Sequence, residues 1–190
     1  MSGIKTIVTV LVLAITLASY YAFASHSANY AAAATIMDNA QTIRNNWEVL
    51  TSSTGLHISQ TTGKQLSPVL IRNHNALDWL VYGEHVMQDQ FKEEFRATNI
   101  RPLMESIHVS SSGNNLHYGV GGARLNQFAI DSEGNTAVFY SEIYRPVLET
   151  LIKLYDNKEF DAKGSNTGVV RYGKLDGGEY AVGIYLDRSH

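Results

Sequence analysis

The stretch from Ile4 to Leu50 reads IKTIVTVLVLAITLASYYAFASHSANYAAAATIMDNAQTIRNNWEVL. Its first half, Ile4 to Ala24, is almost wholly apolar, and no Asp, Glu, Lys or Arg occurs from Thr6 through Met37. The second half, Ser25 to Leu50, changes character without a Pro or a Gly to interrupt it. This pattern predicts one long N-terminal helix that begins in an apolar environment and ends against a globular domain.

The apolar half has the length of a membrane anchor. A helix from Ile4 to Ala24, at about 1.5 Å per residue, spans a bilayer core of about 30 Å. The aromatic residues at its exit end suit a membrane interface, and Lys5 is the only charge at the other end. A cleaved signal peptide is the alternative, because Ala22-Phe23-Ala24 has the small-x-small form of a cleavage site. We expect the mature chain to retain the segment, since the following helix continues it.

The second half carries a different signal. The run Ala31-Ala32-Ala33-Ala34 favours helix, and its small side chains permit close approach of a neighbouring helix. High helix propensity alone explains the alanines equally well. Beyond them, apolar residues recur at steps of three and four, which predicts a helix stripe packed on the globular domain. The residues of this stripe are Ile36, Ala40, Ile43, Trp47 and Leu50. Asp38, Asn39, Gln41, Arg44, Asn45 and Glu48 fall largely off it.

These features of Ile4 to Leu50 give the chain a family resemblance. An apolar helix that runs without a break into an amphipathic helix carrying a small α+β domain resembles the type IV pilins and their pseudopilin relatives. The resemblance implies a helical filament with these helices bundled in its core. Two features depart from the family pattern: Lys5 stands where family members usually carry Glu at the fifth mature position, and no Cys is present for a C-terminal disulfide loop.

The helix pattern, the chain length and the resemblance together predict the fold, the domains and the assembly residues. We expect an α+β fold in which the long N-terminal helix packs on a small antiparallel β-sheet domain with extra helices. The expected parts are a transmembrane or filament-core half at 1–24, an amphipathic continuation at 25–54 and a globular head at 55–190. The residues expected to serve membrane insertion and helix assembly are Ile4, Val8, Leu11, Ile15, Ala31, Ala33 and Ala34.

The rest of the sequence predicts short helices and hairpins. Helices are expected from Asn75 to Tyr82, from Glu84 to Thr98 and from Pro146 to Tyr155. A polar loop is expected at 110–115, and the glycines from Gly119 to Gly122 suggest a bulge or bend rather than a phosphate loop. Alternation predicts that one face of the last strand is formed by Tyr180, Val182, Ile184 and Leu186.

Chemical signals are few. The steps of four between His85, Asp89 and Glu93 are compatible with a metal site and equally with a solvated helix face. A loop gathers oxygen ligands suited to Ca²⁺, although their order does not match an EF-hand; they are Asp156, Asn157, Glu159, Asp161 and Asn166. The metal content is therefore left open. Ser141, Ser189 and His190 form no readable nucleophile motif, and we expect neither an enzyme nor a cofactor.

The net charge of the chain argues against nucleic-acid binding as its main function. A chain with a net charge of −3 is not expected to carry a nucleic-acid-binding face.

We expect a structural subunit of a pilus-like, fimbrial filament that is a secreted homo-oligomer. The subunit would lie in the inner membrane before assembly and at the cell surface afterwards. Its partners would be itself and the membrane, with any surface or receptor target unidentified. The alternative is a membrane-anchored exported binding domain of a secretion apparatus or virion envelope. A third reading is an exported enzyme released by cleavage after Ala24.

Overall fold

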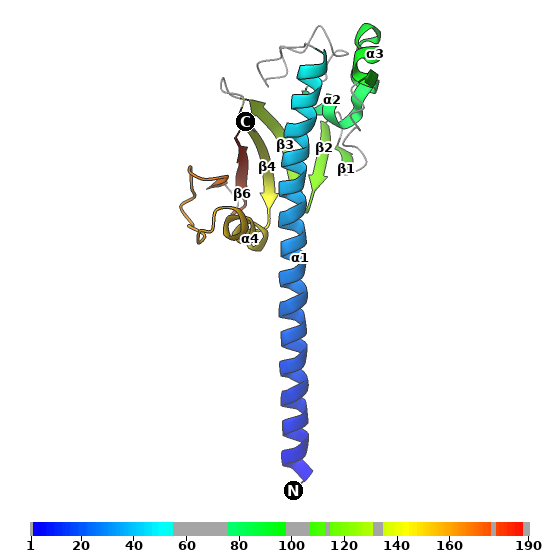
Figure 1. The fold of residues 1–190 in the computed structure, drawn as a ribbon. Helices are drawn as coiled ribbons and strands as arrows, with labels where there is room; N and C mark the ends of the chain where they lie inside the picture. Colours follow the sequence, from blue (N-terminus) through cyan, green and yellow to red (C-terminus); the bar gives the residue numbers. More distant parts are fainter. Residues whose placement is uncertain are drawn as a thin grey trace.

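The first element is a single long helix that extends far beyond the rest of the molecule. The computed structural model describes residues 2–54, 76–97, 107–112, 115–130, 135–175 and 178–187. Helix α1, Ser2–Thr54, contains 53 residues, which at about 1.5 Å per residue gives a length of about 80 Å. Its N-terminal half projects from the head, and its C-terminal half lies against the sheet (Figure 1). The predicted long helix is therefore confirmed.

The head contains one six-stranded sheet in which all neighbouring strands are antiparallel. The strands are β1 (His108–Ser112), β2 (Asn115–Val120), β3 (Ala123–Ile130), β4 (Thr136–Ile143), β5 (Val170–Lys174) and β6 (Tyr180–Leu186), in the order β1-β2-β3-β4-β6-β5. After β4 the chain passes through helix α4, Arg145–Tyr155, forms the edge strand β5 and returns as β6 beside β4. The α+β class, with a long helix, an antiparallel sheet and extra helices, is confirmed.

Alternation along β6 places its apolar residues in the core. Tyr180, Val182, Ile184 and Leu186 are all buried, as the sequence predicts. The glycine between Val182 and Ile184 has a separate role. A Cβ atom at Gly183 would lie 2.7 Å from a Tyr185 ring carbon and 3.3 Å from one of Phe139. These two rings therefore pack closely over Gly183, and a residue with a side chain at this position would collide with them.

The turn between β2 and β3 touches α1 directly. Gly121 and Gly122 have φ values of 57° and 80°, the left-handed conformation that a tight type I′ hairpin turn requires at both central positions. A Cβ atom at Gly121 would lie only 2.7 Å from the carbonyl oxygen of Ala32. Of the predicted bulge or bend, Gly121 and Gly122 form the bend, a tight turn that lets the sheet approach the helix backbone.

A buried polar contact joins α1 to the middle of the sheet. The Tyr140 hydroxyl donates to Oδ1 of Asn39 at 2.9 Å and lies 3.3 Å from the carbonyl oxygen of Ile36. Burial raises the pKa of Tyr140, so the phenol stays protonated and keeps its donor. Asn39 is only 6% exposed, so the expectation that it lies off the packed face of the helix was wrong. The hydroxyl supplies the partner that a buried amide oxygen needs.

Two segments differ from the predicted elements. The single helix expected from Glu84 to Thr98 is divided into the 3₁₀ turn η1, Gly83–Val86, and helix α3, Asp89–Ala97, after helix α2, Ala76–Tyr82. The polar loop expected at 110–115 was wrong at 110–112 and at 115, because Ser110 pairs with His117 and Ser112 with Asn115 in the β1–β2 ladder; 113–114 lie outside the described residues. Serine has weak intrinsic preferences, so strand pairing decides its conformation.

Candidate assembly surface

The segment of α1 outside the head exposes a continuous apolar surface. Every side chain from Ala14 to Ala28, here called the stalk, is exposed. The large apolar side chains among them are between 51% and 76% exposed; they are Ile15, Leu17, Tyr20, Tyr21 and Phe23. The stalk contains no Asp, Glu, Lys or Arg. A contiguous apolar surface of this kind marks a site of protein or membrane contact.

Part of the predicted assembly set lies outside the described side chains. This applies to Ile4, Val8 and Leu11, whereas Ile15 belongs to the stalk and is 59% exposed. In the portions of the chain that the structure describes, no helix has both the length and the hydropathy required for a membrane span.

The alanine run divides between the outside and the inside of the head. Ala31 is exposed and Ala34 is half-buried, but Ala33 is completely buried in the core of its own chain. The expectation that Ala33 meets a neighbouring helix was wrong. The head reaches further along α1 than the apolar stripe predicts, because α4 packs on α1 and the β2–β3 turn touches Ala32, so the core begins before Ile36.

The stripe that was expected to fasten α1 to the head lies in the core. Ile36, Ala40, Ile43 and Trp47 are all buried, and the side chain of Leu50 lies outside the described residues. The Trp47 indole meets the Phe128 ring edge to face, with 5.1 Å between the ring centroids. The same core includes Met37, which the stripe did not contain.

A groove of about 730 Å³ opens where the stalk enters the head. We call it the junction groove. Three separate segments line it: one turn of α1, the exposed side of α4, and the start of the loop between α4 and β5. Its lining residues are His26, Asn29, Tyr30, Arg145, Pro146, Glu149, Thr150, Lys153, Leu154, Lys158, Glu159 and Phe160. Sequence reasoning missed the groove because its walls are distant along the chain.

Two ion pairs form among the charged side chains of the junction groove. Arg145 Nε lies 2.7 Å from Oε1 of Glu149, and Lys153 Nζ lies 3.0 Å from Oε1 of Glu159. The Arg145 guanidinium also lies over the Phe160 ring, 4.7 Å from its centroid. These exposed pairs contribute little to stability, but they neutralise most of the charge that the groove would otherwise present.

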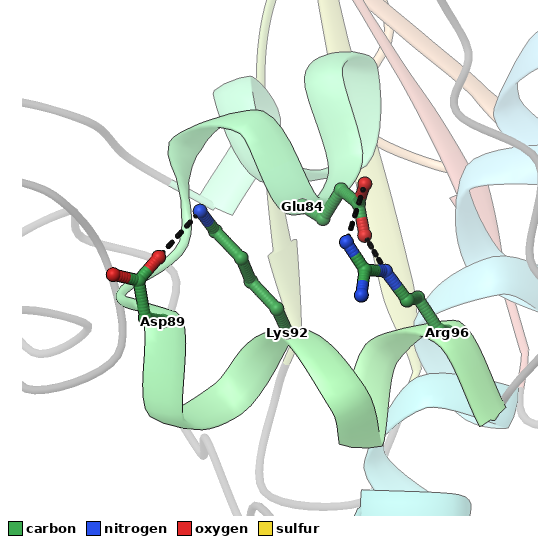
Figure 2. Close-up of polar contacts among 4 residues, drawn as sticks. All are labelled: Glu84, Asp89, Lys92 and Arg96. Atoms are coloured by element: carbon green, nitrogen blue, oxygen red, sulfur yellow. Dashed lines mark hydrogen bonds and ion pairs between the residues drawn. The ribbon is translucent and has the colours of Figure 1, made fainter.

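The structure does not bring His85, Asp89 and Glu93 together as a metal site. His85 belongs to η1, whereas Asp89 begins α3, so the predicted helical spacing does not apply. Asp89 Oδ1 accepts a hydrogen bond from Lys92 Nζ at 2.6 Å, and Glu84 forms an ion pair with Arg96 that bridges η1 and α3 (Figure 2). Arg96 accordingly lowers the pKa of Glu84. The Glu84–Arg96 pair joins η1 to α3, whereas the Asp89–Lys92 pair lies within α3.

The oxygen-rich loop after α4 has a structural explanation. The Asp156 carboxylate accepts hydrogen bonds from the backbone N–H groups of Val169 at 2.7 Å and Val170 at 3.1 Å. Asp161 accepts from the backbone of Lys163 at 2.9 Å. Over the described ranges, no group of three or more His, Cys, Asp or Glu side chains is placed to hold a metal ion. Asp156 therefore fastens the end of α4 to the start of β5, and Asp161 stabilises a turn within the loop.

The serine and histidine residues considered for nucleophilic chemistry form no site in the described structure. Ser141 lies in β4, where its hydroxyl donates to Oδ1 of Asn126 at 3.4 Å. Ser189 and His190 lie outside the described residues. The arrangement that remains is a projecting stalk and the junction groove beside it. Comparison with known proteins yields no match, either to a protein-family model, to a curated protein or to a solved structure.

Proposed function

We propose that this chain is a structural subunit of a pilus-like extracellular filament and that it assembles through its N-terminal helix. The stalk carries the proposal. Its side chains are exposed from Ala14 to Ala28, uncharged, and rich in large apolar groups. Water is a poor environment for such a surface, so a membrane or other copies of the chain must cover it. A bundle of stalks covers it permanently and leaves the heads outside.

The continuity of α1 supports assembly over a simple anchor. One helix joins the uncharged segment to the core stripe, so the position of the stalk is rigidly coupled to that of the head. A flexible tether would suffice to keep a binding domain at a membrane. A repeating assembly instead requires each head to have a defined position relative to its helix. In this proposal the subunit is held in the inner membrane before assembly and is then incorporated into the filament.

Electron microscopy of the sheared native material tests the function. The wild-type chain should yield filaments. Ala22→Glu places a charge in the middle of the stalk and should abolish them, because a carboxylate buried among apolar helices is strongly disfavoured. The control is Gln41→Glu, at an exposed α1 position beside the head, which should assemble normally. Wild-type material that contains only single subunits would refute the filament proposal.

A further inference from the structure

The junction groove combines exposed apolar surface with charges that are largely paired. Tyr30 is 51% exposed and Leu154 is 40% exposed, so both sides of the groove present large apolar groups to solvent. The two ion pairs of Arg145 and Lys153 stand among them. The remaining cation, Lys158, has Nζ 3.4 Å from the Thr167 hydroxyl. Since two of the three groove cations are already paired, a partner with apolar surface and no net charge of its own suits this groove.

The charge and the position of the groove both favour one occupant. The α1 sequence carries no Asp, Glu, Lys or Arg from Thr6 through Met37, and the stalk displays three exposed aromatic rings, Tyr20, Tyr21 and Phe23. The groove also contains residues of α1 itself, so it is continuous with the stalk surface. A helix packed along one stalk thus reaches the groove without leaving that surface.

We propose that the junction groove receives the aromatic segment Tyr20–Phe23 of a second copy of this chain. The inference rests on the proposed assembly function and specifies where two subunits meet. Phe23 and Tyr30 are seven residues apart, so they share one side of the helix at about 10 Å separation along its axis. A parallel neighbour displaced by about that distance brings its Phe23 to the level of Tyr30 at the groove.

Anionic lipid headgroups are the main rival occupants, because Arg145, Lys153 and Lys158 lie at the base of the head. Glu149 and Glu159 offset two of these three cations directly. A surface that attracts anionic lipid uses clustered basic residues without such compensation. The internal pairing therefore favours a neutral protein surface over a lipid phosphate.

Disulfide trapping between two differently tagged full-length chains tests the contact. One chain carries Ala24→Cys, which keeps all three aromatic rings, and the other carries Leu154→Cys in the groove. The chain has no Cys of its own, and each copy has a single thiol, so a mixed disulfide joins two copies. The Cα atoms must approach within about 7 Å for it to form. Leu175→Cys is the control partner, since Leu175 and Leu154 are both 40% exposed.

The expected result is a mixed dimer of Ala24→Cys with Leu154→Cys, at twice 21.0 kDa plus tags, and at least ten times less with Leu175→Cys. The same samples are imaged for filaments. Filaments without the Leu154→Cys product overturn the groove contact and leave the filament function standing. Single subunits without any mixed dimer overturn both. A chain retained by vesicles containing anionic phospholipid but not by neutral ones, without the mixed dimer, assigns the groove to lipid and overturns the contact.

Discussion

Gly121→Ala should destabilise the head by moving the sheet away from α1. The new methyl group would meet the Ala32 carbonyl oxygen at 2.7 Å, a backbone atom that shifts only if the helix or the hairpin shifts. Gly121 also has a φ of 57°, which costs a residue with a side chain about 1 to 2 kcal/mol. Overpacking of a close contact adds about 1 to 3 kcal/mol. The total is a loss of about 2 to 5 kcal/mol.

The neighbouring glycine separates these two contributions. Gly122 has a φ of 80°, but a Cβ atom there would meet nothing within 4 Å. Gly122→Ala should therefore show the conformational cost alone, about 1 to 2 kcal/mol. The difference between the two variants measures the contact between the turn and α1.

Thermal unfolding of the full chain in mild detergent provides the assay. A loss of 1 kcal/mol lowers Tm by about 2 to 4 °C for a domain of this size, so Gly121→Ala should melt about 2 to 12 °C below Gly122→Ala. Equal Tm values for the two variants would mean that the turn does not press on the helix.

The remaining predictions concern other contacts of α1. Trp47→Ala should cost about 3 to 5 kcal/mol, because it empties a buried site against Phe128; an unchanged melting curve would show that the indole is outside the core. Tyr140→Phe should cost about 1 to 3 kcal/mol, because it leaves the buried Asn39 oxygen without its 2.9 Å donor. In the same thermal unfolding measurements Tyr144→Phe is the control, since Tyr144 is 70% exposed; similar losses for both tyrosines would refute the assigned role of the Tyr140 hydroxyl.

The sequence by itself determined the features that depend on neighbouring residues. The uncharged run and the lack of a Pro or Gly between Ser25 and Leu50 predicted one uninterrupted helix, because helix formation is decided within a few turns. Period-two alternation predicted the buried face of β6 for the same reason. The α+β class followed from such local signals.

Only the tertiary structure decided which surfaces meet. The sequence pattern places Asn39 on the solvent-facing side of the helix. In the structure Asn39 is buried and accepts a hydrogen bond from Tyr140, 101 positions away. Ala33 was expected to meet a neighbouring helix, but the core of its own chain encloses it. The junction groove exists only where residues 26–30, 145–154 and 158–160 converge. Burial and charge pairing depend on groups brought together from distant parts of the chain, and periodicity within one segment carries no information about them.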